Sequence, residues 1–496
     1  MIFNNGITLN NLDVSVLKLL KLIYKKTKII CTIGPGVESV EKITGLIQSG
    51  MDAARLNFSH GDHEIHKRYI KNIRESSESC GKIIPIIQDL SGPKIRVGKI
   101  VNSEITLSEG QTITLTAEDI TGNKDFLSLN HPEIIEDIKV GERVLMDDGN
   151  LMLKVVAKPN KHEVKCEVLT GGILKERKGV NLPDTELNVP SLTAKDIKDL
   201  DFGISNGLDL FAMSFVRSVD DIKMLKGILR AKGKSSPVIS KIERPEAIAN
   251  IDEIIKESDL VMVARGDLGV EISTEEVPLL QKMIIKKCNE NLTPVITATQ
   301  MLESMINSPT PTRAEASDVA NAVLDGTDCV MLSAETSTGN YPIKAVEELK
   351  KIILRTETIK KSSFFKEIFV EDSPENTLYT LCNSASVISL RLSAKAIITI
   401  SQQGKSPLLL SSHRPAAQII NATFSPDLIK QSKLIWGVES ILFDRKPDCD
   451  LNNAFGQIRE IIIRDGILNK GDRVVVLASI PFSEGGSANS IMINRI

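Results

Sequence analysis

The sequence predicts an α/β fold, a (β/α)8 barrel of the TIM type with an inserted β-barrel domain after its third strand and a C-terminal α/β domain. A chain of 496 residues is too long for one core and should divide into about three domains. From Lys28 onward, eight short β-branched runs alternate with longer helical patterns. Eight parallel strands joined by helices close naturally into a barrel.

The eight predicted strands are continuously apolar, which is typical of a parallel sheet covered by helices on its outer face. They are Lys28–Ile33, Ala53–Phe58, Ile83–Asp89, Leu210–Ser214, Val238–Ile242, Leu260–Ala264, Val295–Ala298 and Cys329–Leu332. The polar residues of interest follow the ends of these strands, where barrels of this kind carry their active sites.

Two further regions interrupt and follow the barrel. The stretch Val97–Val189 is rich in Gly, Thr and Val, and alternating segments such as Gln111–Leu115 predict an inserted β domain over the barrel mouth. Pro183 and Pro190 stiffen its exit and predict a hinge. After Glu371 the pattern predicts a small α/β domain, with a helix over 375–392 and strands over 396–400, 418–422 and 473–477. The predicted division is an N-terminal arm (1–26), the barrel (27–97 and 190–370), the lid (98–189) and a C-terminal regulatory domain (371–496).

Composition excludes several classes of protein. Apolar residues make up 42% and charged residues 25%, the balance of a soluble globular protein, and a net charge of −3 gives no reason to expect a nucleic-acid partner. Seven scattered cysteines without a Cys-x-x-Cys pair favour the cytoplasm over a disulfide framework. The stretch Val14–Tyr24 contains Lys18 and Lys21 and is shorter than the ~20 residues of a membrane span. It predicts an amphipathic arm and no membrane partner, with a targeting peptide as the less favoured alternative.

Carboxylates and cations follow two neighbouring predicted strands. Lys241 and Glu243 are two residues apart, so their side chains leave one side of the backbone, and Arg265 and Asp267 come just past the next strand. One carboxylate from each strand end suits a magnesium ion whose other ligands are water and substrate oxygens. Alternatively, Lys241 and Glu243 pair only with each other, and Asp267 caps a helix.

Three other strand ends carry polar side chains. Thr299 follows the seventh strand and is either a helix cap or a substrate contact, and Ser333 and Glu335 are either cap residues or a proton relay. Arg55 alternates with Asn57 and Ser59 along one side of the second strand, where a guanidinium suits phosphate.

Two other kinds of site have little support. The three-residue spacing of His60, His63 and His66 permits zinc, but it is more typical of a surface helix. The sequence contains no Walker A loop and no Gly-x-Gly-x-x-Gly, so any phosphate must be held by Arg, Lys and metal.

Taken together, the motifs resemble the signature blocks of pyruvate kinases, in the family's order over residues 27–345. The blocks are Thr27–Pro35, Arg55–Gly61, Gln88–Arg96, Ile239–Glu243, Met262–Gly269, Thr297–Met305 and Asp318–Thr336. The resemblance implies an enzyme of glycolysis that transfers the phosphoryl group of phosphoenolpyruvate to ADP, giving pyruvate and ATP.

The resemblance also implies roles for individual residues. Glu243 and Asp267 would hold Mg²⁺ or Mn²⁺, while Lys241 and Arg55 would neutralise the phosphoryl group. The substrate would be bound by Lys241, Arg55, Ser214, Thr299 and the backbone around Gly266 and Asp267. The proton path to enolpyruvate would run through Thr299 with a water, supplied by Ser333 and Glu335. The nucleotide would be bound by Arg55, Asn57, Arg96, Pro35 and His60, with Asp148 of the lid facing its magnesium.

One departure from the family concerns potassium. Members that require this ion carry Glu where this sequence has Lys94 and Thr-Lys where it has Leu90-Ser91, whereas residues that resemble the other ligands, Asn57, Ser59 and Asp89, are retained. The comparison implies that the Lys94 ammonium replaces the ion and that K⁺ is not required. Alternatively, Lys94 is a solvated loop residue.

A phosphate-binding loop is expected in the C-terminal domain, between a strand and a helix, and consists of Ser401, Gln402, Gln403, Gly404, Lys405 and Ser406. Family members bind sugar-phosphate activators here. Because Gln402 and Gln403 carry no charge and the segment 480–486 lacks Trp and Arg, we expect a weaker or different sugar-phosphate or nucleotide effector, with Lys405 as its cation. The family further implies an allosteric homotetramer.

Two other functions fit parts of the pattern. A barrel lyase or aldolase that enolises pyruvate on a metal would use similar residues but would not need the insert. A degenerate sensor that keeps only the fold is disfavoured because Arg55, Lys241, Glu243, Asp267, Thr299 and Glu335 are all intact.

Overall fold

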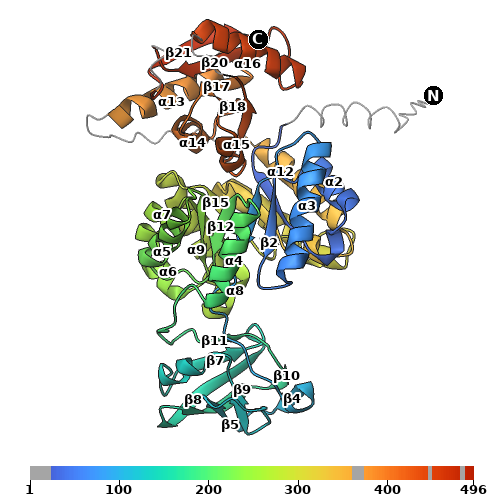
Figure 1. Ribbon diagram of the computed structural model, residues 1–496, viewed down its shortest axis with the longest axis vertical. Coiled ribbons are helices and arrows are strands. Elements are labelled where there is room, and N and C mark those ends of the chain that lie inside the picture. Colours follow the sequence, from blue (N-terminus) through green and yellow to red (C-terminus); the bar gives the residue numbers. More distant parts are fainter. Residues whose placement is uncertain (1–23, 360–373, 445–449, 481–485) are drawn as a thin grey trace, which may run out of the picture.

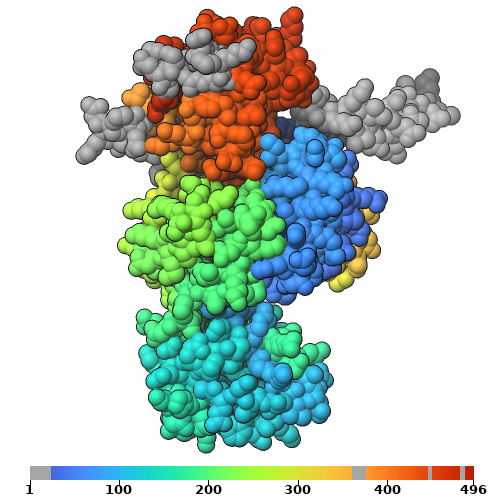
Figure 2. Space-filling model, in the orientation of Figure 1, coloured from blue at the N-terminus to red at the C-terminus, as the bar shows by residue number. Residues whose placement is uncertain are grey.

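The computed structural model describes residues 24–359, 374–444, 450–480 and 486–496, and it consists of three bodies in a row (Figure 1). The barrel lies in the middle, with the insert at one end and the C-terminal domain at the other, and the space-filling view shows the same order (Figure 2). Most of the expected arm, residues 1–23, lies outside the described residues.

The central body is a closed barrel of eight parallel strands in the order β1-β16-β15-β14-β13-β12-β3-β2. The strands are β1 (Lys28–Thr32), β2 (Ala53–Asn57), β3 (Ile86–Asp89), β12 (Leu210–Met213), β13 (Val238–Ile242), β14 (Leu260–Ala264), β15 (Val295–Ala298) and β16 (Cys329–Leu332). The predicted fold class and all eight strands are confirmed. The third strand begins at Ile86 instead of Ile83, because Ile83 is exposed and Pro85 has no N–H for the ladder.

Helices surround the barrel. They are α2 (Val40–Ser49), α3 (His63–Ser79), α4 (Ala194–Ser205), α5 (Val219–Ala231), α6 (Pro245–Ala249), α7 (Ile251–Glu257), α8 (Arg265–Glu271), α9 (Val277–Glu290), α10 (Arg313–Asp325), α11 (Ala334–Ser337) and α12 (Pro342–Glu357), with 3₁₀ turns η1 (Pro35–Val37) and η4 (Glu303–Ile306). Polar residues set several starts: Asp62, Thr193 and Thr312 each accept a backbone hydrogen bond at the first turn of their helix.

Alternate residues of the strands build two cores. In β1, Ile29 and Cys31 face outward into the core under the helices, whereas Ile30 faces the barrel interior. The interior is filled with side chains such as Met262 and Ile296. The barrel is therefore a solid platform, and its chemistry must lie at the strand ends.

The amino-terminal ends of the strands share one device. An aspartate directly precedes every second strand in chain order and accepts a hydrogen bond from a backbone N–H of the neighbouring strand. The four bonds are Ile29 N to Asp52 (2.7 Å), Ile86 N to Asp209 (2.8 Å), Val238 N to Asp259 (2.9 Å) and Val295 N to Asp328 (2.9 Å). These carboxylates fix the register of adjacent strands at this end of the barrel.

The insert contains a six-stranded sheet, order β11-β7-β8-β9-β5-β6, and the pair β10-β4 around its own hydrophobic core. The elements are η2 (Val101–Ser103), β4 (Glu104–Leu107), β5 (Thr112–Thr116), β6 (Phe126–Ser128), η3 (Pro132–Glu136), β7 (Arg143–Met146), β8 (Leu151–Asn160), β9 (Glu163–Thr170), β10 (Gly172–Lys175) and β11 (Val180–Asn181). The predicted β domain is confirmed, as a curled and mainly antiparallel sheet.

The C-terminal domain has a five-stranded sheet in the order β19-β18-β17-β20-β21. Its elements are α13 (Pro374–Arg391), β17 (Ala396–Ile400), α14 (Lys405–Ser412), β18 (Gln418–Thr423), α15 (Pro426–Ser432), β19 (Val438–Leu442), α16 (Leu451–Arg464), β20 (Arg473–Ala478) and β21 (Ser490–Arg495). The predicted helix and three strands are confirmed. The two edge strands were not predicted: β21 is antiparallel and half exposed, so it lacks the continuous apolar run of the others. Among the helices of the described ranges, none has the length and apolarity to cross a membrane.

Candidate active site

The mouth of the barrel brings together buried polar and charged side chains from four neighbouring strands. The Lys241 ammonium lies 2.7 Å from Glu243 Oε1 and 3.3 Å from Asp89 Oδ1, and it donates a 2.7 Å hydrogen bond to Ser214 Oγ. Arg55 binds the other oxygen of Asp89 through Nε and Nη2, at 2.7 and 2.6 Å. Two cations and two carboxylates thus share one site that is almost closed to solvent.

The neighbouring charges stabilise the charged forms of Asp89 and Lys241 more than that of Glu243. Burial raises the pKa of Asp89, but Lys241 and Arg55 outweigh it and hold the pKa below its usual value. Burial lowers the pKa of Lys241, but the carboxylates of Asp89, Glu243 and Asp267 raise it well above normal. Burial also raises the pKa of Glu243, and there the attraction of Lys241 does not fully compensate. The ammonium is held charged, and Glu243 lacks part of the positive charge that would stabilise its carboxylate.

Glu243 and Asp267 are the candidate metal ligands. Glu243 is anchored by a 2.8 Å hydrogen bond from Phe215 N, and the negative charge of Asp267 adds to the raised pKa of Glu243. The N-cap residue of α8 is Ala264, and Asp267 lies inside the first turn of that helix. The capping alternative for Asp267 is therefore wrong. No group of three or more His, Cys, Asp or Glu side chains in the described ranges could hold a metal. Two carboxylates, one fixed and one open, therefore fit an ion that takes its other ligands from water and substrate.

Thr299 faces the backbone of Gly266. Gly266 N donates a 2.8 Å hydrogen bond to Thr299 Oγ1, which donates one of 2.6 Å to Ala298 O. Thr299 has a positive φ of 64°, a strained conformation for a β-branched residue. The helix-cap alternative for Thr299 is wrong, because the next helical turn, η4, begins at Glu303.

Arg265 holds the Thr299 loop in place. Its guanidinium donates to Thr299 O at 2.6 Å and pairs with Asp318 at 2.6 Å, and the side chain is buried. The sequence marks Arg265 by its position at a strand end, but its partners lie 34 and 53 residues away. Arg265 thus holds the strained loop in position through its contact with Thr299 O.

Glu335 is buried and fixes two backbone segments. It accepts hydrogen bonds from Ser333 N at 2.7 Å and Leu302 N at 3.1 Å, and burial raises its pKa despite these donors. Within the described residues the Ser333 hydroxyl makes no hydrogen bond, and none joins Glu335 to Thr299. A proton relay through these residues would need intervening water.

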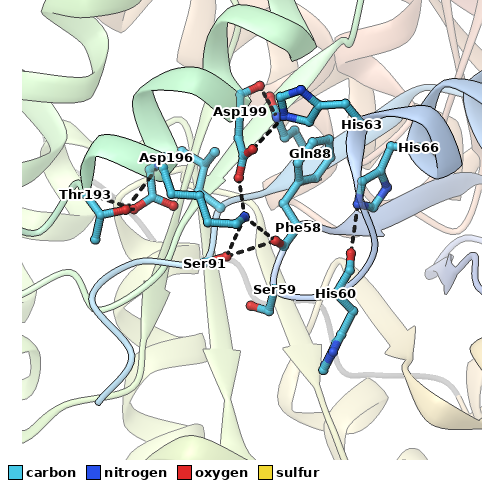
Figure 3. A network of polar contacts seen from close by, with 12 residues as sticks. Phe58, Ser59, His60, His63, His66, Gln88, Ser91, Thr193, Asp196 and Asp199 are labelled. Atoms are coloured by element: carbon cyan, nitrogen blue, oxygen red, sulfur yellow. Dashed lines mark hydrogen bonds and ion pairs between the residues drawn. The ribbon is translucent and has the colours of Figure 1, made fainter. Parts of the chain in front are cut away.

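The three histidines do not form a metal site. His66 is buried, stacks on Phe58 at 4.0 Å between ring centroids and bonds to His60 O at 2.9 Å. His63 bonds to Asp199 at 2.8 Å (Figure 3). The expectation of surface histidines therefore fails for His66, which packs against the second strand.

Lys195 ties two mouth loops together, and sequence reasoning missed it. Its ammonium donates to Phe58 O at 2.7 Å, to Asp199 at 2.6 Å and to Ser91 Oγ at 3.4 Å. Figure 3 shows Phe58 and Ser91 on either side of this contact. The loops that carry Ser59 and Ser91 are thereby held at fixed spacing.

Two of the candidate nucleotide residues, Arg55 and Arg96, carry charges close to a third, His60. Burial lowers the pKa of His60, and the nearby charges of Arg96, Lys94 and Arg55 lower it further. Arg96 also donates to Arg177 O of the insert at 3.1 Å. Pro35 begins η1 at the end of the first strand. Arg55, Arg96 and His60 thus act on one region, where an anion would be favoured.

Asp148 belongs to the insert, in a turn with positive φ at Asp147 (53°) and Asp148 (55°). Asp147 pairs with Lys178 at 2.6 Å, and no hydrogen bond or ion pair joins the Asp148 side chain to another described residue. The next residue, Gly149, approaches Val270 of α8, since a Cβ at Gly149 would lie 3.7 Å from that side chain. The turn therefore reaches the rim of the barrel.

The residues compared with a monovalent-cation site lie among the mouth loops. Ser214 Oγ donates to Leu90 O at 2.7 Å, and Asn57 Oδ1 accepts from Ser59 N at 3.1 Å. Lys94 is one-third exposed and lies 3.9 Å from Asp267 Oδ1. Its ammonium is therefore directed toward the candidate metal ligand.

A set of arginines fixes the exit of the insert, and none was identified from the sequence. Arg217 donates to Leu187 O at 2.5 Å and Val189 O at 2.7 Å. Arg244, next to Glu243, lies 3.4 Å from Glu271, which accepts a 2.6 Å hydrogen bond from Asn181. The predicted hinge is thus attached to the two elements that carry the candidate metal ligands.

In the C-terminal domain, the expected effector loop lies between β17 and α14. Gly404 has a φ of 76°, and its N–H donates to Ser401 Oγ at 3.0 Å. The tight turn places the loop Ser401–Ser406 at the start of a helix. Residues 481–485 of the segment expected to close over it lie outside the described residues.

Comparisons with known proteins agree with this geometry. The model of the pyruvate kinase barrel domain matches residues 24–346, and that of the pyruvate kinase alpha/beta domain matches residues 379–494. A pyruvate kinase of Geobacillus stearothermophilus is 43% identical over 475 residues, covering 95% of this chain and 80% of the relative. A pyruvate kinase of Staphylococcus aureus (strain MRSA252) is 41% identical over 478 residues, with the same coverage. The crystal structure of a pyruvate kinase from Cryptosporidium parvum has a TM-score of 0.87 and 35% identity, covering 96% of this chain and 97% of the other.

Proposed function

Because this chain belongs to the pyruvate kinase family, we propose that the charged mouth of its barrel is the site at which it acts. The chain is a phosphotransferase of glycolysis that converts phosphoenolpyruvate and ADP to pyruvate and ATP. The lyase, aldolase and sensor alternatives are thereby set aside. The observation that carries the site proposal is the buried Lys241 ammonium held between Glu243 and Asp89, beside Arg55.

Charge neutralisation is the main task that we assign to these residues. Phosphoryl transfer needs positioning and cations more than a covalent nucleophile, and the residues that we assign here are cations and metal ligands. Lys241 and Arg55 would face the phosphoryl group, and the Lys241 ammonium would stabilise the enolate that remains. Ser214 would orient Lys241, whose 2.7 Å hydrogen bond to it fixes the ammonium.

The family generally uses a divalent metal ion. We assign Mg²⁺, or Mn²⁺, to Glu243 and Asp267, where its charge would relieve the negative field that raises the pKa of Glu243. The ion would supply Lewis-acid stabilisation of substrate oxygens. Exhaustive chelation should abolish pyruvate formation in a coupled assay, and Glu243→Ala should weaken metal affinity at least tenfold. Unchanged metal affinity in that variant would contradict the assignment, with Glu253→Ala as an exposed control.

The second half of the reaction, protonation of enolpyruvate, is assigned to Thr299 with a water. Gly266 N and the Thr299 hydroxyl already form one 2.8 Å contact, and both would hold the substrate carboxylate. Ser333 and Glu335 would replenish the proton through water. The insert would close over the mouth and exclude bulk water, bringing Asp148 to the nucleotide bound by Arg96, Pro35, His60 and Asn57.

We also infer that potassium is not required. Lys94 places a positive charge 3.9 Å from Asp267, beside the region that receives phosphates, while Asn57, Ser59, Asp89 and Leu90 form the remnant of the ion site. Turnover in a potassium- and sodium-free tetraalkylammonium buffer should not rise when potassium is added. In Lys94→Glu it should become potassium-dependent, and in the exposed control Lys99→Glu it should stay flat. A tenfold rise for the unmodified chain would overturn the inference.

Regulation is assigned to the loop Ser401–Ser406. Its turn at Gly404 and the helix that follows suit a phosphate, with Lys405 as the cation and the hydroxyl of Ser406 and the amides of Gln402 and Gln403 as neutral contacts. We propose a sugar-phosphate or nucleotide effector that binds more weakly than fructose 1,6-bisphosphate binds its activated relatives, or that differs from it, acting on a cytoplasmic homotetramer. Calorimetry with fructose 1,6-bisphosphate should show weak binding, and tight binding would contradict the proposal.

A further inference from the structure

A cavity of about 250 Å³ lies at the amino-terminal end of the barrel, opposite the mouth. Helix α5 and the turn into β13 form its barrel wall, and Gln431 of α15 lines it from the C-terminal domain. Figure 1 shows α15 on the side of that domain that faces the barrel. The two domains are joined beside the cavity by an ion pair of 2.9 Å between Lys430 and Asp209.

Five of the polar side chains that line this cavity lack protein partners within the described ranges. Arg230, Lys234, Ser235, Ser236 and Gln431 all line it, and none of these side chains makes a hydrogen bond or ion pair with another residue of the described ranges. They offer a guanidinium, an ammonium, two hydroxyls and an amide, all of which can donate hydrogen bonds. Convergent donors without acceptors around one hollow are the features of an anion site.

The charge of the cavity is also uncompensated. A third cation, Lys226, is already paired, because it lies 3.3 Å from Asp259 and 3.4 Å from Glu257. Asp259 is the one carboxylate in the wall, and it also accepts the hydrogen bond from Val238 N. Three cations, Lys226, Arg230 and Lys234, therefore face the two carboxylates of Asp259 and Glu257, which leaves about one positive charge without a counterion.

We propose that this cavity binds the phosphate group of a small anion and that the bound anion bridges the barrel and the C-terminal domain. Arg230 matches two phosphate oxygens with its planar fork, and Lys234 supplies a point charge. The serine hydroxyls and the Gln431 amide complete the set, and the volume is below the ~300 Å³ at which pockets for drug-sized ligands begin, so the ligand is small.

The position of the cavity connects it to the active site. Its wall includes Ser235, Ser236 and Asp259, which immediately precede β13 and β14. At the mouth end, β13 carries Lys241, and β14 leads into the helix that carries Asp267. An anion bound here would rest on the base of the strands that position the catalytic charges.

Calorimetric titration of the full chain tests the proposal with two probes, inorganic phosphate and glycerol 3-phosphate. Removing both cations (Arg230→Ala with Lys234→Ala) should weaken one binding event at least tenfold, while turnover stays unchanged because neither residue touches the active site. A matched double variant at exposed lysines, Lys223→Ala with Lys256→Ala, should bind as the unmodified chain does. Tighter binding of the ester would identify a phosphate monoester as the ligand, and equal binding would identify free phosphate.

A second variant tests the bridging step. Gln431→Ala should weaken the same binding event several-fold and reduce the rise in melting temperature that the probe produces. The Lys405→Ala variant, altered in the effector loop, should retain the event. Titrations of the Arg230 and Lys234 double variant that superimpose on those of the unmodified chain, for both probes, would overturn the proposal.

Discussion

Both ends of the barrel hold paired carboxylates, but the partners of these carboxylates differ. At the amino-terminal end, four aspartates each accept a backbone N–H of the preceding barrel strand and pair with a nearby cation: Asp52, Asp209, Asp259 and Asp328. At the mouth, Asp89 and Glu243 face the side chains of Lys241 and Arg55. A carboxylate paired with a cation therefore does not by itself identify an active site; the kind of partner does.

The difference has a physical consequence. A carboxylate that accepts a backbone N–H of a neighbouring strand fixes the register of the two strands. A carboxylate paired with side-chain cations can exchange such a cation for a metal ion, and the freed cation can then meet a phosphate. We therefore expect substitutions at the mouth to affect turnover first and substitutions at the amino-terminal end to affect stability first.

The largest effect is expected from Lys241→Met. Its ammonium faces charge that grows in the transition state, so turnover should fall at least a hundredfold, while the affinity for phosphoenolpyruvate changes less. Steady-state kinetics with pyruvate detection measure both. A variant that keeps more than a tenth of normal turnover would remove Lys241 from its role.

A smaller loss of turnover is expected from Arg265→Lys. Lysine cannot reproduce the contacts of the guanidinium with Thr299 O and Asp318, so the strained loop should relax and turnover should fall about tenfold. The exposed control Arg313→Lys should be unaffected. Normal turnover in Arg265→Lys would show that the loop is held by other contacts.

Sequence reasoning predicted the charged residues that line the mouth, but not the contacts that hold them in place. Lys241 and Glu243 are two residues apart on one strand, so their shared direction is visible in the sequence. Arg265 and Lys195 act on partners that are brought near only by closure of the barrel, Asp318 and Phe58 respectively. Contacts between residues so far apart in the chain leave no pattern in the local sequence.

The same limit applies to the fold. The eight barrel strands are fully buried and read as apolar runs, whereas the edge strand β21 is half exposed and carries no such run. The aspartates before the strands are visible in the sequence, but their hydrogen bonds depend on which strands become neighbours.

At the amino-terminal end, Asp209→Ala should lower stability and leave turnover nearly intact. The change removes the acceptor for Ile86 N and the ion pairs with Arg74 and Lys430, at a cost of about 2–4 kcal/mol. The apparent melting temperature should fall by roughly 5–10 °C. The exposed Asp201→Ala should change it by less than about 2 °C.

The smallest expected effect concerns pH at the base of the C-terminal domain. Burial lowers the pKa of His413 to about 4, so the folded chain favours the neutral imidazole. The unfolded chain protonates near pH 6.5, so this stability is present above that pH and is lost as pH falls toward 4. Between pH 7.5 and 5, the free energy of unfolding should fall by about 1–2 kcal/mol less in His413→Phe than in the unmodified chain. Melting temperatures measured across this pH range would show the smaller fall. An unchanged pH profile would contradict this, with the exposed His162→Gln as control.

The most direct test measures turnover and melting temperature together for Lys241→Met and Asp209→Ala. The contrast between the two ends predicts opposite losses: the first variant loses turnover and keeps its melting temperature within a few degrees, and the second does the reverse. Equal losses of both properties in both variants would show that the two ends of the barrel do not divide catalysis and stability in this way.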